Sequence, residues 1–137
     1  MATTGLANHA ARLGGRRILI VEDEYFIADD LSRALRRQDA EVVGPVSDLA
    51  AGLDLAKREQ LDGAVLDVNL DGEMSYPIAD ELNQRGVPFL FTTGYDQTTL
   101  ADEYRSITRI EKPCDVNAVI ALLAELVGDS AGRDREP

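Results

Sequence analysis

Hydrophobic and polar residues follow one another along the chain in blocks that predict strands and helices in turn. Short apolar runs bounded by turn residues are typical of buried strands. These runs cover residues 18–21, 42–46, 61–67, 87–92 and 106–111. Between them, apolar residues recur at helical spacing with charged residues on the opposite side. The helices predicted from this spacing cover residues 26–37, 49–56, 76–84, 98–104 and 116–127.

Strands that alternate with helices predict a parallel sheet covered by helices on both faces. We therefore expect a single α/β domain over residues 16–127, with right-handed crossovers. Residues 1–15 are small, polar and aperiodic, and we expect a flexible leader there. Residues 128–137 are polar, and we expect a disordered tail. In a sheet of this kind the ligand site lies at the carboxyl ends of the strands.

Composition narrows the range of partners. The chain has 137 residues and a net charge of −11, which argues against nonspecific binding to nucleic acid or to an anionic membrane. No apolar run is long enough for a transmembrane helix, and residues 1–15 lack the apolar core of a signal peptide. Cys114 is the single cysteine, so no internal disulfide can form. The cytoplasm is the expected location.

Chemically active side chains stand where the predicted strands end. Glu22 and Asp23 follow the first strand, Asp67 ends the third, Thr93 the fourth, and Lys112 follows the fifth. In a parallel sheet these groups converge on one edge. Three carboxylates crowded there repel one another, and at least one is driven to protonate. A divalent cation bridging the acids, or an ion pair between Lys112 and Asp67, relieves this repulsion.

Oxygen ligands in small number favour Mg²⁺, because Mg²⁺ shares its coordination sphere with water and phosphate oxygens. A carboxylate held beside such a cation, a lysine and a hydroxyl can act as a nucleophile toward a phosphoryl group.

Each residue also has a purely structural interpretation. Glu22 and Asp23 complement a helix dipole, Asn69 and Asp71-Gly72 form turns, and Thr93 or Lys112 ends a strand. The functional interpretation rests on their coincidence at one edge.

Together these residues resemble the receiver domain of two-component response regulators, over roughly residues 16–127. The resemblance is carried by Glu22-Asp23, Asp67, Asn69, Thr93 and Lys112-Pro113. It implies a CheY-like, flavodoxin-like three-layer fold whose five-stranded sheet has the order 2-1-3-4-5. Residues 89–95 also resemble the Phe-Ala-Thr-Gly-Tyr signature of a receiver subfamily that often consists of single-domain proteins. Thr92 stands in place of the alanine of that signature.

The resemblance also implies roles for the site residues. Asp67 is the implied phosphoacceptor, and Lys112 and Thr93 contact the phosphoryl group. Asp23 and Asp67 are the implied direct Mg²⁺ ligands. Glu22 acts through metal-bound water, and Asn69 contributes its backbone carbonyl. The Lys112-Pro113 peptide bond is implied to be cis.

The sequence departs from the family pattern at three positions. Receivers commonly have an aromatic residue three positions before the lysine, where this chain has Arg109. The residue after the Lys-Pro pair is often Phe and here is Cys114. Glu22 replaces the more usual Asp. These departures leave the phosphorylation chemistry in place and remove the usual coupling between threonine and aromatic ring, so Thr93, Tyr95 and the fourth helix become the expected switch elements.

The resemblance predicts a stand-alone receiver in a two-component phosphorelay. Asp67 accepts a phosphoryl group from a histidine kinase or histidine phosphotransferase, and the product signals by protein–protein interaction. The chain is expected to be a monomer or weak homodimer, and to catalyse only its own phosphorylation and dephosphorylation. Two alternatives remain open: a pseudo-receiver that binds its partner without phosphorylation, and an aspartyl-phosphate hydrolase of the haloacid dehalogenase type. The hydrolase would need a second acid where Asn69 stands.

Overall fold

A computed structural model describes residues 9–94, 100–112 and 115–134, with side chains placed up to residue 128. Five parallel strands form the central sheet, in the order β2-β1-β3-β6-β7. These strands are β1 (Arg17–Val21), β2 (Glu41–Val46), β3 (Gly63–Asp67), β6 (Phe89–Thr93) and β7 (Arg109–Glu111). The predicted order 2-1-3-4-5 is thereby confirmed, with β6 and β7 as its fourth and fifth strands.

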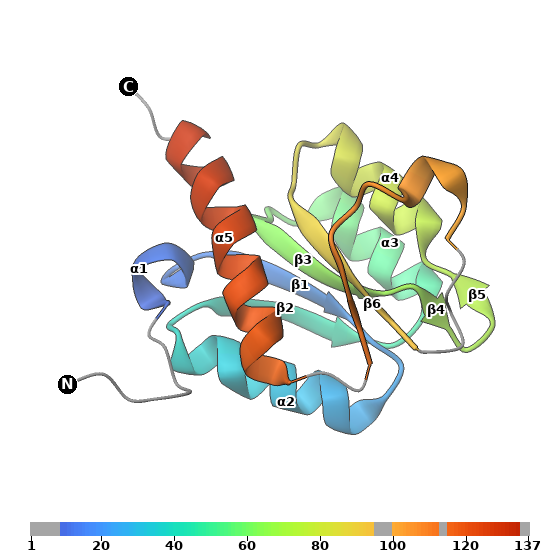
Figure 1. The fold of residues 1–137 in the computed structure, drawn as a ribbon, viewed down its shortest axis with the longest axis horizontal. Helices are drawn as coiled ribbons and strands as arrows, with labels where there is room; N and C mark the ends of the chain where they lie inside the picture. The colour runs from blue at the N-terminus through green and yellow to red at the C-terminus, as the bar shows by residue number, and fades with distance from the viewer. Residues whose placement is uncertain (1–8, 95–99, 113–114, 135–137) are drawn as a thin grey trace.

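Helices cover both faces of the sheet (Figure 1). The helices are α1 (Ala10–Leu13), α2 (Tyr25–Arg37), α3 (Leu49–Arg58), α4 (Tyr76–Gln84) and α5 (Val116–Asp134). Side chains of α2 and α5 share a core with Ile18, Ile20 and Val65 on one face. Side chains of α3 and α4 share a second core with Leu19 and Leu66 on the other face. Alternate residues of β1 and β3 therefore enter opposite cores, as the period of two requires.

A small hairpin follows the third strand of the sheet. Strands β4 (Asn69–Leu70) and β5 (Glu73–Met74) pair antiparallel across Asp71-Gly72. Both turn residues have positive φ, 54° at Asp71 and 97° at Gly72. Asp-Gly is a favoured dipeptide for such a turn, because both residues tolerate this backbone conformation. The sequence predicted only a loop at this point.

The structure differs from the predicted helix over residues 98–104 and from the predicted disordered tail over residues 128–137. Residues 98–104 were expected to form a helix, and the structure has a short 3₁₀ turn, η1 (Asp102–Tyr104), while residues 95–99 lie outside the described part. The expected disordered tail, 128–137, is helical as far as Asp134, the end of α5. Apolar periodicity ends at Val127, but no proline lies between Val127 and Asp134, and the helix continues through Gly128 and Gly132.

The expected flexible leader, 1–15, also differs where the structure describes it. Residues Ala10–Leu13 form α1, and Leu13 is fully buried in the core between the sheet and α5. The N–H of Gly15 donates a hydrogen bond to the carbonyl of Asp39 at 2.8 Å. One apolar side chain and a few backbone hydrogen bonds therefore hold this segment against the domain. The polar composition of the segment as a whole does not predict this packing.

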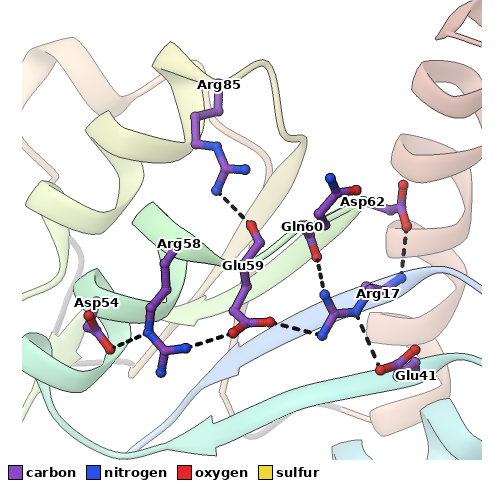
Figure 2. Close-up of polar contacts among 8 residues, drawn as sticks. All are labelled: Arg17, Glu41, Asp54, Arg58, Glu59, Gln60, Asp62 and Arg85. Carbon is purple, nitrogen blue, oxygen red and sulfur yellow. Dashed lines mark hydrogen bonds and ion pairs between the residues drawn. The ribbon is translucent and has the colours of Figure 1, made fainter.

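A polar network closes the amino end of the sheet, opposite the strand ends that carry the candidate site (Figure 2). Arg17, at the start of β1, pairs with Glu59 at 3.0 Å and donates to the carbonyl of Gln60 at 3.1 Å. Its backbone N–H donates to Asp62 at 2.9 Å. Arg85, at the end of α4, donates to the carbonyl of Glu59 at 2.8 Å. The connection from α3 to β3 is thus tied to two other elements, which fixes where β3 begins.

No helix in the described ranges combines the length and the apolar content needed to cross a membrane.

Replacing Leu13 by Ala tests whether α1 belongs to the domain. The change removes a fully buried side chain, so we expect the free energy of unfolding to fall by about 2–4 kcal/mol. Urea denaturation of both proteins measures this difference. Leu126→Ala, at a partly buried position on α5, is the control and should lose less. A change at Leu13 below about 0.5 kcal/mol would show that α1 adds nothing to the core.

Candidate functional site

The carboxyl edge of the sheet brings the predicted site residues together. Asp67 is the last residue of β3, and Glu22 and Asp23 follow β1, which pairs directly with β3. Thr93 ends β6, and Lys112 follows β7. Because all these strands are parallel, their ends share one edge. Residues up to 90 positions apart in the chain, such as Glu22 and Lys112, are thus in contact.

Three carboxylates form a compact cluster at this edge. One oxygen each of Glu22, Asp23 and Asp67 lies within 4.8 Å of the others. Glu22 is 2% exposed and Asp67 is 4% exposed, while Asp23 faces solvent more openly. Oε1 of Glu22 is buried and has no hydrogen-bond partner among the described residues. A buried, unpartnered anionic oxygen is costly, so this cluster is suited to a further cationic ligand.

Lys112 provides the positive charge that the cluster faces. Its Nζ lies 2.9 Å from Oε2 of Glu22, 3.1 Å from Oδ2 of Asp67 and 3.3 Å from Oε2 of Glu24. An ammonium has three protons to donate, so these three acids account for all of them. Glu24 was not among the predicted site residues. The acidic run 22–24 was visible in the sequence, but periodicity alone does not show that Glu24 turns back toward the site.

The pKa values reflect burial and crowding. Burial raises the pKa of Asp67 to about 6, with a further increase from the charge of Glu22 that Asp23 and Lys112 only partly oppose. Burial, and then the neighbouring Asp67, raises the pKa of Asp23. Burial by itself would lower the pKa of Lys112, but its hydrogen bond and ion pairs with Glu22 and Asp67 outweigh this and raise it. At neutral pH the site therefore holds more negative charge than it can easily stabilise.

These acids fit Mg²⁺. The donors are hard carboxylate oxygens, and the unpartnered Oε1 of Glu22 and the raised pKa of Asp67 both indicate unmet demand for positive charge. Asn69 is placed beside them by its backbone, since its N–H donates to Oδ1 of Asp67 at 3.2 Å. Its side-chain oxygen accepts from the N–H of Gly72 at 2.6 Å. The side-chain oxygen of Asn69 therefore serves the turn, while its backbone N–H contacts Asp67.

Two threonines end β6, and they face opposite sides of the sheet. Thr93 is 4% exposed, and its carbonyl accepts from the N–H of Lys112 at 2.6 Å, which fixes the lysine at the edge. Thr92 pairs in register with Asp67 and is 1% exposed. Its Oγ1 has no hydrogen-bond partner among the described residues. In the sequence, Thr92 differs from the signature alanine, but that difference alone predicts no role for its hydroxyl.

The strand β7 carries an arginine where receivers commonly have an aromatic residue. Arg109 is exposed on β7, so no aromatic ring occupies that strand position. Aromatic rings gather instead around Phe91. There the rings of Tyr76 and Tyr104 are stacked, with their centroids 4.0 Å apart and an angle of 4° between their planes. The hydroxyl of Tyr104 donates to Asp80 at 2.8 Å. Tyr95, Pro113 and Cys114 lie outside the described residues, and so does the predicted cis bond before Pro113.

Comparison with known proteins agrees with this geometry. A family model described as the response regulator receiver domain matches residues 18–124. The transcriptional regulatory protein PdtaR of Mycobacterium tuberculosis is 29% identical over 121 residues, which are 85% of this chain and 59% of PdtaR. The sensory transduction protein LytT of Bacillus subtilis is 33% identical over 103 residues, 72% of this chain and 43% of LytT. The chain thus spans about half the length of these curated relatives.

Among solved structures, the solution structure of SdrG from Sphingomonas melonis Fr1 has a TM-score of 0.72 and 35% sequence identity. The match covers 85% of this chain and 97% of SdrG. A receiver from Sinorhizobium medicae WSM419 has the same TM-score at 21% identity, and at that identity it supports the fold alone.

The raised pKa of Asp67 predicts a pH-dependent gain in stability for Asp67→Asn. A carboxyl whose folded pKa is about 6, against about 3.9 unfolded, binds its proton more tightly in the native state. Its charge therefore destabilises the fold as pH rises from about 4 to 6, and fully so above that range. We expect Asp67→Asn to be more stable than the wild type at pH 8, on the order of 2 kcal/mol, and the difference to shrink at pH 5.

Thermal denaturation with a chelator present measures this difference. Asp102→Asn, at a side chain that is 91% exposed, is the control. It should leave the melting temperature unchanged at both pH 8 and pH 5. A destabilised Asp67→Asn variant at pH 8 would mean that the ion pair with Lys112 outweighs the crowding of the acids.

Proposed function

Because the chain belongs to the family of response regulator receiver domains, we propose that it is a phosphorylation-controlled receiver with Asp67 as its phosphoacceptor. Membership already assigns it to two-component signalling. The proposal adds the residue, the cation and the donor class. The observation that carries it is the buried carboxylate of Asp67, held between two further acids and Lys112 at one edge of the sheet.

The residues of the site suit nucleophilic attack on a phosphoryl group. An oxygen of Asp67 attacks phosphorus, the bond from phosphorus to the donor's histidine nitrogen breaks, and the imidazole leaves as an acyl phosphate forms. Bound Mg²⁺ supplies positive charge to the transferring oxygens. Glu22 and Asp23, with Asp67 and the backbone of Asn69, are the residues that would hold it. Lys112 is 3.1 Å from Asp67 and is placed to pair with a phosphoryl oxygen.

The remaining roles follow from position. Thr93 stands at the end of β6, one strand from Asp67, where its hydroxyl can donate to a phosphoryl oxygen. The chain catalyses only its own phosphorylation and dephosphorylation in this proposal. The hydrolase alternative lacks the acid it needs, since Asn69 stands there and its amide oxygen is engaged by Gly72. A pseudo-receiver would have no use for the complete set of three acids and a lysine.

Acetyl phosphate with Mg²⁺ tests the proposed acceptor. We expect the wild type to gain one phosphoryl group by intact mass, and to gain none when the cation is chelated. Asp67→Asn should gain none under either condition, because an amide is not a nucleophile toward phosphorus. Asp71→Asn, four residues away in the exposed turn, is the matched control and should react like the wild type. Equal labelling of the wild type and Asp67→Asn would refute the proposal, and sustained turnover of a phosphomonoester would favour the hydrolase.

The donor has to reach Asp67 across the surface beside it. Tyr25 and Phe26 begin α2, directly after the acidic run, and they are 73% and 79% exposed. Their rings pack edge to face at 5.4 Å. Adjacent aromatic rings exposed to this degree are typical of interaction surfaces. We include them in the proposal as the part of the chain that docks the phosphodonor.

Phe26→Ser separates docking from chemistry. With a phosphorylated histidine kinase that transfers to the wild type, we expect transfer to slow about tenfold, as for loss of an aromatic interface contact. With acetyl phosphate, which needs no docking surface, the rate should be unchanged. Arg105→Ser, at an exposed position directly after η1, is the control and should leave both rates unchanged. Slowing with both donors would instead place Phe26 in the chemistry or the fold.

A further inference from the structure

Thr92 lies in the same row of the sheet as Asp67. The two residues are register partners between β3 and β6, and Thr92 is also the partner of Ile110 on β7. Register partners in a parallel sheet project from the same face. Leu90, two residues earlier on β6, belongs to the core under α2 and α5, so Thr92 faces that side as well. The side chain of Thr92 therefore lies next to the phosphoacceptor Asp67, on the face of the sheet that α2 and α5 cover.

The hydroxyl of Thr92 does nothing for the fold as it stands. The residue is 1% exposed, and its Oγ1 has no hydrogen-bond partner among the described residues. A buried hydroxyl without a partner is unfavourable, whereas a valine of the same shape leaves no polar atom unsatisfied. A hydroxyl at this position thus needs another explanation, in a state of the protein where it acquires a partner.

A cavity connects Thr92 with Lys112. It has a volume of about 190 Å³ and opens between α2, α5 and the end of the sheet. Besides these two residues it is lined by Ile27, Asp30, Leu31, Val116 and Val119. A cavity of this size holds water where polar atoms line it. The lysine side chain therefore has room to move, and a hydrogen-bonding group lies within the space it borders.

Phosphorylation would change the acceptors of Lys112. Its three protons now go to Glu22, Asp67 and Glu24. One oxygen of Asp67 would become the bridging oxygen of the acyl phosphate, and the exposed Glu24, at 3.3 Å, is the most distant of the three acceptors and the first to be released. The ammonium of Lys112 would gain a phosphoryl oxygen as an acceptor and lose a present one. A proton of Nζ could then be donated into the cavity that Lys112 lines.

We propose that Thr92 is a positioning residue for Lys112. In the phosphorylated state the Thr92 hydroxyl accepts a hydrogen bond from Nζ of Lys112, directly or through one water molecule in the cavity, and holds the ammonium against the phosphoryl group. This inference rests on the proposed phosphorylation of Asp67. It gives the two adjacent threonines separate functions, because their side chains project from opposite faces of the sheet.

The test compares Thr92→Val and Thr92→Ser in phosphorylation by acetyl phosphate with saturating Mg²⁺. Valine keeps the shape and removes the hydroxyl, so we expect an unchanged or higher melting temperature and phosphorylation that is about tenfold slower, the effect of one hydrogen bond to a charged group. Serine restores the hydroxyl and should restore the rate. Equal rates for the wild type and Thr92→Val would overturn the inference and leave the proposed function intact. A wild type that accepts no phosphoryl group would overturn both.

A double-mutant cycle with Lys112→Gln shows whether Thr92 acts through the lysine. Glutamine removes the ammonium and keeps a side chain of similar reach. If Thr92 acts only by positioning Lys112, then Thr92→Val should cause no further loss of rate in the Lys112→Gln background. A loss of equal size in both backgrounds would overturn the inference, because it would show that Thr92 acts independently of the lysine. Should Lys112→Gln fail to fold, the comparison of valine with serine decides alone.

Discussion

The attraction between one ammonium group and three carboxylates determines what this molecule can do. Lys112 contacts Glu22, Asp67 and Glu24, and without it the acids at the carboxyl edge would stand together with no neutralising charge. Even with it, the pKa of Asp67 remains raised to about 6. Four acids stand at this edge, Glu22, Asp23, Glu24 and Asp67, so their charge exceeds that of the single ammonium by three. A site in this condition responds strongly to any added positive charge and to any change in the acceptor, which is the property that a chemical switch requires.

The two ends of the sheet divide stability and reactivity between them. At the amino end, Arg17, Glu59 and Arg85 tie β1, the α3–β3 connection and α4 together through well-matched pairs. At the carboxyl end, like charges are held in contact by the rest of the fold. Such local destabilisation persists only where the surrounding structure holds it in place. The fully buried strands β3 and β6 supply that support.

How far the sequence predicts this structure depends on the range of the forces involved. Alternating strands and helices, and acids at strand ends, are local patterns, so the sheet order and the convergence of Asp67 with Lys112 could be predicted. The faces of Thr92 and Thr93 could not, because a shift of one residue in register exchanges them. Nor could the contact of Glu24 with Lys112, which lie 88 positions apart. Leu13 is buried by contact with α5, which begins more than a hundred residues later. The short polar segment around Leu13 therefore gives no local sign of this burial.

The packing of α1 on α5 has a practical meaning for anyone who labels this protein. Helix α1 lies beside α5, with the side chain of Arg12 next to Gly128, while the first turn of α5 follows the segment that carries Lys112 (Figure 1). Both ends of the described chain therefore emerge on the side of the molecule away from the acids. A fluorophore or a surface tether attached at either end of the described chain, near residue 9 or residue 134, leaves the carboxyl edge open to small phosphodonors and to large ones.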